Sequence, residues 1–228
     1  FLRVVLRQVG QVSEYHVVGR PLHIEEPLGG IIMSKKRADP LEKSSFNLIK
    51  TLWNVTAKGL HRYTNATTRT SWVMAKGAFD LCDSPLPIFV HNTSQTPGLD
   101  RRRITELGGP CSRLDSSAIC MSPIDFLVEL CMEIGKNGGK SKLIFEGFSL
   151  GAIMCTALAP IVHDRAMGRQ IGARRSDWIM PQFELRQLGG MKIGDAAMTQ
   201  YISQSMLCLN VISFKDPVSR MVDNPALT

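Results

Sequence analysis

The sequence has 228 residues, a length that suits one large α/β domain. Its hydrophobic share of 44% and charged share of 21% are those of an ordinary globular protein. No apolar run reaches the roughly 18 residues that cross a bilayer, so no transmembrane helix is predicted. The net charge is +7, yet no basic cluster alternates with aromatic residues, so we expect no nucleic-acid groove. The six cysteines form neither a C-x-x-C pair nor a zinc-spaced cluster, so no metal site is predicted.

The first 80 residues predict strands followed by helices. Strands are expected at residues 1–9, 14–18 and 31–33. A helix is expected from Asp39, because Asp39 can cap it, Pro40 suits its first turn and Glu42 completes a capping box. Its apolar face would consist of Phe46, Ile49, Trp53 and Leu60. Residues 72–81 are also expected to be helical, and the placement of residues 1–80 in the fold is left open.

From residue 87 onward, apolar strands alternate with helices. The expected elements are, in order, a buried parallel strand at Pro87–Val90, a helix that starts with a capping box at Ser122–Asp125 and reaches Ile134, a strand at Lys142–Glu146, a helix at Ile153–Ile161 and a strand at Leu207–Phe214. This alternation predicts the α/β class, with a mostly parallel sheet flanked by helices. We expect a single domain over residues 1–228, with its core at residues 87–220.

Ser149 lies in the pattern Gly147-Phe148-Ser149-Leu150-Gly151, between a predicted strand and a predicted helix. A serine hydroxyl is a poor nucleophile until a base takes its proton and the backbone holds its oxygen clear of the sheet. A sharp strand-to-helix turn does the second job, and the flanking glycines leave room for the tight backbone. The backbone N–H of Leu150 would then donate to the developing oxyanion. We therefore predict that Ser149 is a nucleophile; an incidental turn is the alternative.

Three stretches resemble the class 3 (fungal-type) lipases, a family with the α/β-hydrolase fold. Gly147–Ala152 resembles the family's G-H-S-L-G-G turn, with Phe148 in place of the usual histidine. Gly189–Asp195 resembles its G-S-P-R-V-G-N segment, and Val211–Arg220 is similar to the strand and D-P-V-P-R turn that carry its catalytic acid. The resemblance covers Pro87 to Arg220. It implies that Asp216 orients the imidazole of a Ser–Asp–His triad; a simple Asp-Pro turn is the alternative.

The loop after the Pro87–Val90 strand is the expected source of a second oxyanion donor. The class 3 lipases carry R-G-T at this place, and His91-Asn92-Thr93 is similar at the threonine. Thr93 is therefore the candidate, followed by Ser94. A polar loop without a catalytic role is the alternative.

Residues 95–121 follow that loop and are interpreted as a lid. The segment is rich in glycine and proline, and it places Arg101–Arg103 beside the apolar residues Ile104 and Leu107. A flap with one apolar side and a basic edge would open on an anionic membrane surface. An ordinary solvated loop is the alternative.

The catalytic base is harder to assign, because all five histidines precede Asp216 whereas the order in the family is Ser, Asp, His. These histidines are His16, His23, His61, His91 and His163. Three explanations are open: the base lies beyond Thr228, an upstream histidine such as His91 replaces it, or the chain is inactive. We expect the first, because the chain opens directly in a predicted strand without an initiator methionine.

These patterns together predict a serine hydrolase that cleaves carboxylic esters, as a lipase or phospholipase acting on a lipid or ester substrate. Ser149 would attack the acyl carbon and Asp216 would orient the imidazole, while Leu150 and Thr93 would hold the oxyanion. This chemistry uses neither a metal nor an organic cofactor. Two alternatives stay open: a non-lipid esterase or thioesterase on the same fold, or a catalytically silent binding domain.

Overall fold

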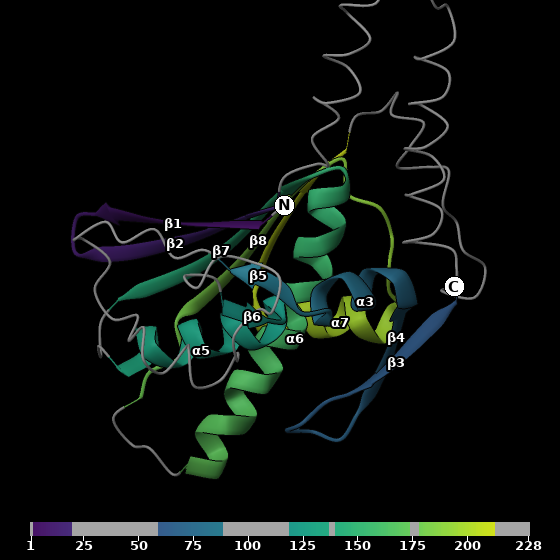
Figure 1. Ribbon diagram of the computed structural model, residues 1–228, viewed down its shortest axis with the longest axis horizontal. Coiled ribbons are helices and arrows are strands. Elements are labelled where there is room, and N and C mark those ends of the chain that lie inside the picture. Colours follow the sequence, from purple (N-terminus) through teal and green to yellow (C-terminus); the bar gives the residue numbers. More distant parts are fainter. Residues whose placement is uncertain (1, 20–58, 89–118, 137–139, 174–177, 213–228) are drawn as a thin grey trace, which may run out of the picture.

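A computed structural model describes residues 2–19, 59–88, 119–136, 140–173 and 178–212 of the chain (Figure 1). The strands are β1 (Leu2–Val9), β2 (Val12–Gly19), β3 (Leu60–Thr64), β4 (Ser71–Ala75), β5 (Leu86–Ile88), β6 (Ile119–Met121), β7 (Ser141–Phe148), β8 (Gln182–Leu188) and β9 (Leu207–Val211). The helices are α3 (Lys76–Asp83), α5 (Pro123–Lys136), α6 (Leu150–Ala173) and α7 (Ala196–Ser205). None of these helices is long and apolar enough to cross a membrane.

The main sheet has five strands in the order β1-β2-β7-β8-β9. Strand β1 is antiparallel to β2, whereas β2, β7, β8 and β9 run parallel to one another. Helix α6 contacts β2, β7 and β8, and α7 contacts β9. The fold is therefore an α/β fold with a mixed, mostly parallel sheet and flanking helices, and the predicted class is confirmed at this level.

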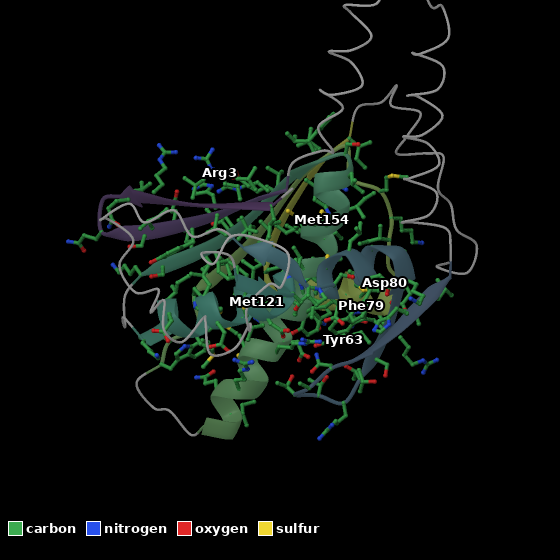
Figure 2. The ribbon with its side chains drawn as sticks, in the orientation of Figure 1. Arg3, Tyr63, Phe79, Asp80, Met121 and Met154 are labelled. Carbon is green, nitrogen blue, oxygen red and sulfur yellow. The ribbon has the colours of Figure 1, made fainter. Side chains whose placement is uncertain are left out.

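The described helices cover one face of this sheet, and we call it the helix face. Helix α6 connects β7 to β8 and α7 connects β8 to β9; because parallel crossovers are right-handed and both advance in the same direction, both helices lie on the same side. Val17, Phe145 and Leu185 are buried on this face. The opposite face, the outer face, carries Arg3, which Figure 2 shows on the side of the sheet away from α5, α6 and α7.

A hairpin of β3 and β4 replaces part of the helix predicted at residues 72–81. Ser71–Ala75 is a strand, and the helix begins only at Lys76. Leu60, predicted on a helical face, instead begins β3. The rings of Tyr63 and Trp72 stack across the hairpin with centroids 4.8 Å apart, a cross-strand contact that a helical period in sequence cannot reveal. The rest of the first predicted helix, residues 39–58, and the predicted strand at 31–33 lie outside the described residues.

A buried carboxylate on α6 holds this hairpin in place. Asp164 is fully buried and accepts hydrogen bonds from the Tyr63 hydroxyl at 2.8 Å, the Ala66 N–H at 2.8 Å and the Thr67 hydroxyl at 3.3 Å. Three donors satisfy a charge that would otherwise be costly to bury. Figure 2 shows Tyr63 on the hairpin side of the helices.

The prediction of a buried parallel strand at Pro87–Val90 is wrong. Strand β5 (Leu86–Ile88) pairs antiparallel with β6 in a separate two-stranded sheet. Proline has no N–H to donate and so suits an edge strand rather than the middle of a sheet. The next predicted helix is confirmed with its capping box: Ser122 Oγ accepts from the Asp125 N–H at 3.1 Å and donates to the Asp125 carboxylate at 2.8 Å.

The remaining predicted elements agree with the structure over the described residues. The strand at 142–146 is β7, which extends to Phe148, and the helix at 153–161 is the middle of α6. The strand predicted from Leu207 is β9, which reaches Val211, while Phe214 lies outside the described residues. Strand β8, which was not predicted from the sequence, lies between β7 and β9.

Candidate functional site

Ser149 occupies the turn between β7 and α6. Its φ of 53° lies in the left-handed region, which a residue with a side chain rarely adopts. The Ser149 N–H donates to the Leu188 carbonyl at 3.2 Å, and the Ser149 carbonyl accepts from the Ile153 N–H at 3.2 Å. These bonds fasten the turn to β8 on one side and start the helix on the other. The residue is half-buried at the carboxyl edge of the sheet.

Glycines make this tight turn possible. A Cβ on Gly147 would come closer than 3.0 Å to the backbone of Gly151 and Ala152. A Cβ on Gly19, at the end of the neighbouring strand β2, would lie 2.5 Å from the Gly151 carbonyl oxygen. The first turn of α6 therefore packs directly on the backbone of β7 and β2, and only glycine fits at either place.

The start of α6 offers hydrogen-bond donors next to Ser149. Leu150 begins the helix, so its N–H has no acceptor within the helix, and the positive end of the helix dipole lies at the same place. Among the described residues, the Ser149 hydroxyl has no hydrogen-bond partner. The predicted oxyanion donor Leu150 is thus adjacent to the predicted nucleophile in a helix-start geometry suited to anions.

A pocket of about 460 Å³ lies at the carboxyl ends of the parallel strands, beside this turn. Its lining comes from β2, β7, β8 and β9, with Val18, Gly19, Glu146, Gly147, Phe148, Arg186, Gln187, Leu188, Leu209 and Val211. Phe148, Leu188 and Val211 share the outer face, because paired residues of neighbouring strands point the same way. The pocket therefore opens on the outer face, away from α6.

Ion pairs cross the outer face next to the pocket. Arg186 donates to Glu146 at 2.8 Å and to Glu184 at 2.6 Å, and Lys142 donates to Glu184 at 2.8 Å. Burial alone would raise the pKa of Glu184, but the hydrogen bonds and charges of Lys142 and Arg186 outweigh it, so that pKa is lowered. Both terminal nitrogens of the Arg186 guanidinium therefore donate to carboxylates of this protein, and the Arg186 charge is already paired.

No described histidine is placed to act as the base for Ser149. His163 lies fourteen residues after Ser149 on α6, about 21 Å along the helix, and its Nδ1 contacts the Tyr201 hydroxyl at 2.9 Å. His61 lies in β3, within the β3–β4 hairpin, and stacks on Phe79 of α3. His16 pairs with Ile144, which precedes Ser149 by five residues along β7 and the turn. The His16 ring contacts the carboxylates of Glu14 and Glu146 at 3.3 Å each.

The structure places two of the predicted site residues, Ser149 and Leu150, and brings them together at one turn. Asp216 and Thr93 lie outside the described residues, as do Ser94, His91 and the basic cluster at 101–103. The strand beside β7 is β2, whereas the strand that precedes Thr93, β5, pairs with β6 in a separate sheet. Gly19 was not predicted from the sequence; the signal for it is a glycine directly after Val17 and Val18, at the end of β2.

The segment Gly189–Asp195 has a structural role. The Asp195 carboxylate caps α7 by accepting from the Met198 N–H at 2.9 Å, and it also accepts from the Val73 N–H at 3.0 Å. The backbone of Ile193 accepts from Ala75 at 2.7 Å. This segment therefore joins the β3–β4 hairpin to the end of the main sheet, on the helix side of the turn that holds Ser149.

No protein-family model and no curated protein sequence matches this chain. Among solved structures, the chain is similar to one described as the crystal structure of M37 lipase, at 14% sequence identity and a TM-score of 0.48. The match covers 97% of this chain and 49% of the lipase chain, so this chain spans about half the length of that lipase. A likeness of this size does not establish a shared activity. Within the described ranges, no group of three or more metal-ligating side chains is clustered for a metal ion.

Proposed function

We propose that this protein is a serine hydrolase of the α/β-hydrolase type, with Ser149 as the nucleophile. The supporting observation is the left-handed backbone of Ser149 on a strand-to-helix turn. That conformation costs about 1–2 kcal/mol for a residue with a Cβ, and such strain is typically found where function needs it. A strained turn at this position is the one that presents a nucleophilic serine above a parallel sheet.

The oxyanion would be held by two backbone N–H groups. Leu150 supplies the first, from the start of α6. The sheet order favours a second donor from the chain that follows Gly19, because β2 is the strand next to β7 and ends against the first turn of α6. Thr93 is the second candidate, on its similarity to the class 3 lipases alone.

Asp216 would orient the catalytic imidazole. Strands β7, β8 and β9 end at the same edge, since Phe148 pairs with Leu188 and Leu188 with Val211. Asp216 follows Val211 by five residues, so the chain leaves the sheet toward Asp216 from the edge that holds Ser149. The base is a histidine outside the described residues. We propose that it lies beyond Thr228, with His91 and His23 as alternatives within this sequence.

The substrate would be a carboxylic ester, and we propose a lipid or phospholipid ester. Ser149 would attack the acyl carbon while the imidazole takes its proton, giving an acyl-enzyme that water then hydrolyses. The lipid preference is supported by the resemblance of three stretches to the class 3 lipases. A membrane-binding lid would fit the same preference; of the predicted lid at residues 95–121, residues 119–121 form β6 and the remainder lies outside the described residues.

Labelling of the full-length protein with a fluorophosphonate probe tests this proposal. Ser149→Ala should abolish labelling, whereas Ser203→Ala, which changes an exposed serine on α7, should leave it unchanged. Labelling that persists in Ser149→Ala would contradict the assignment. Absence of labelling in the unaltered protein would favour the silent binding domain. Hydrolysis of p-nitrophenyl esters by the 228-residue chain itself, lost in His91→Gln or His23→Gln, would place the base within this sequence.

A further inference from the structure

A buried cysteine lies next to the Ser149 turn, where helix α6 rests on the ends of two strands. Cys155 comes about one helical turn after Gly151, so both residues lie on the same side of α6. Its side chain is fully buried, and its thiol sulfur lies 3.2 Å from the Glu146 carbonyl oxygen on β7 and 3.7 Å from the Val17 carbonyl oxygen on β2. One thiol thus contacts the backbone of both strands just before they reach the edge that holds Ser149.

The end of β2 packs against Cys155 as well as against the first turn of α6. A Cβ on Gly19 would lie 3.0 Å from the Cys155 Sγ, in addition to its close approach to the Gly151 carbonyl. Gly19 pairs with Gly147 across the two strands, so this contact lies beside the backbone that leads into Ser149. Helix α6 therefore sets the position of Gly19 through two neighbouring groups, the Gly151 backbone and the Cys155 thiol.

The Cys155 thiol stays protonated at neutral pH and can therefore donate a hydrogen bond. Burial raises the pKa of Cys155 to about 12, and a hydrogen bond from the Gly19 backbone opposes this rise. A neutral thiol has one proton and a weakly accepting sulfur, so it can donate to one of the two carbonyls while it accepts from Gly19. Because a buried, protonated thiol is not a reactive nucleophile, the role that suits Cys155 is to hold the backbone of the two strands.

We propose that Cys155 is a positioning residue of the hydrolase site, because its thiol fixes the end of β2 against the end of β7. This role rests on the proposed function, in which the chain that follows Gly19 supplies the second oxyanion donor. An N–H that stabilises a developing oxyanion must lie about 2.7–3.1 Å from it. A displacement of about 1 Å at such a group can reduce the rate roughly 10²-fold. A thiol that holds Gly19 in place thus acts on the reaction without touching the substrate.

Substitution of Cys155 in the full-length protein tests this role. Cys155→Ala removes the donor, and we expect kcat for a p-nitrophenyl ester to fall about tenfold or more while KM changes less than about twofold, since the oxyanion forms only after the substrate is bound. Cys155→Ser restores a donor and should recover most of kcat. Cys131→Ala is the matched control. Cys131 is also fully buried, but it lies on α5 and its thiol contacts the Met180 sulfur at 3.9 Å, so its truncation should lower stability without changing kcat.

Amide hydrogen exchange gives a second measurement, which does not depend on activity. In Cys155→Ala, the backbone amides of Val17–Gly19 and Glu146–Phe148 should exchange about tenfold faster than in the unaltered protein, because the ends of β2 and β7 open locally more often. Mass spectrometry of the peptides that contain these residues measures the rates. Cys155→Ser should restore slow exchange, and Cys131→Ala should leave both segments unchanged. Unchanged exchange in Cys155→Ala would overturn the proposal.

The two measurements separate the role of Cys155 from the assignment of Ser149. If the unaltered protein hydrolyses the ester and Cys155→Ala keeps its kcat, the positioning role is overturned and the assignment of Ser149 stands. Equal losses of kcat in Cys155→Ala and Cys155→Ser would also overturn the positioning role, because the hydrogen bond would not be the cause. If the unaltered protein neither hydrolyses the ester nor reacts with a fluorophosphonate, the proposed function fails, and the positioning role fails with it whatever the exchange rates show.

Discussion

Gly147 and Gly151 face each other across the Ser149 turn so closely that a Cβ on Gly147 would overlap the Gly151 backbone. Gly19 approaches the Gly151 carbonyl from the neighbouring strand in the same way. The backbone before, after and beside Ser149 is thus packed without free space. Because the neighbours fix the path of the chain, Ser149 is held in a conformation that it would not adopt alone.

Gly147→Ala should destabilise the fold. The added methyl group meets backbone atoms, which cannot rotate away, so we expect a loss of about 1–3 kcal/mol in the free energy of unfolding, as for overpacked cores. Urea denaturation followed by circular dichroism measures it. Gly168→Ala in α6 is the matched control, because its methyl group meets only the Ala66 side chain at 3.1 Å and gains helix propensity. Equal losses in both variants would contradict the steric argument.

Ser149→Gly should be more stable than Ser149→Ala by about 1–2 kcal/mol. Both substitutions remove the hydroxyl, but alanine keeps the Cβ that strains a backbone with φ of 53°, whereas glycine relieves it. Thermal unfolding of the two variants under one set of conditions gives the difference. Both should lose fluorophosphonate labelling.

Arg69→Gly separates strain relief from function. Arg69 is the other non-glycine residue with positive φ in the described part of the chain, at 61°, and its side chain is exposed in the β3–β4 turn. We expect a similar gain in stability with full labelling of Ser149. A gain at Arg69 without one at Ser149 would mean that the left-handed turn at Ser149 is not strained.

The features that sequence predicted well are those encoded within a few residues. The Ser122–Asp125 capping box and the strand–turn–helix around Ser149 each depend on residues close in the chain, and both are present. The β3–β4 hairpin was missed because its strands are stabilised by the Tyr63–Trp72 stack and by Asp164, which is about one hundred residues away in the chain. A local sequence pattern carries no information about partners so distant in the chain.

The candidate site was predictable only in part for the same reason. Ser149 and Leu150 belong to one motif, so one short pattern located both. The strand beside them, β2, comes from the other end of the chain, and nothing in its own sequence indicates that it pairs with β7. The sequence predicted a parallel strand at Pro87–Val90, whereas the strand that pairs in parallel with β7 on this side is Val12–Gly19.

Stability should fall as the pH drops below about 6.5 because of His163. Burial lowers the pKa of His163, against a smaller opposing effect of Asp164, and its ring lies edge-on to Phe183 and is hydrogen-bonded to Tyr201. As the pH falls, the unfolded chain therefore takes up a proton on His163 before the folded chain does. The contribution of His163 to the free energy of unfolding is fully present above its pKa in the unfolded chain. It is lost as the pH falls from there toward the lower pKa of the folded chain. The decline from one such group is at most about 1.4 kcal/mol per pH unit.

Comparison of variants isolates the contribution of His163. His163→Gln removes the titrating group, and the slope of unfolding free energy against pH between 5 and 7 should decrease relative to the unaltered chain. Tyr201→Phe removes the hydrogen bond but leaves His163 on the buried side of α6, so it should lower stability at every pH and keep the slope. Urea denaturation at several pH values measures all three proteins. If His163→Gln keeps the full slope, the ring is already protonated in the folded chain or accessible to water, and the decline below pH 6.5 must come from another group.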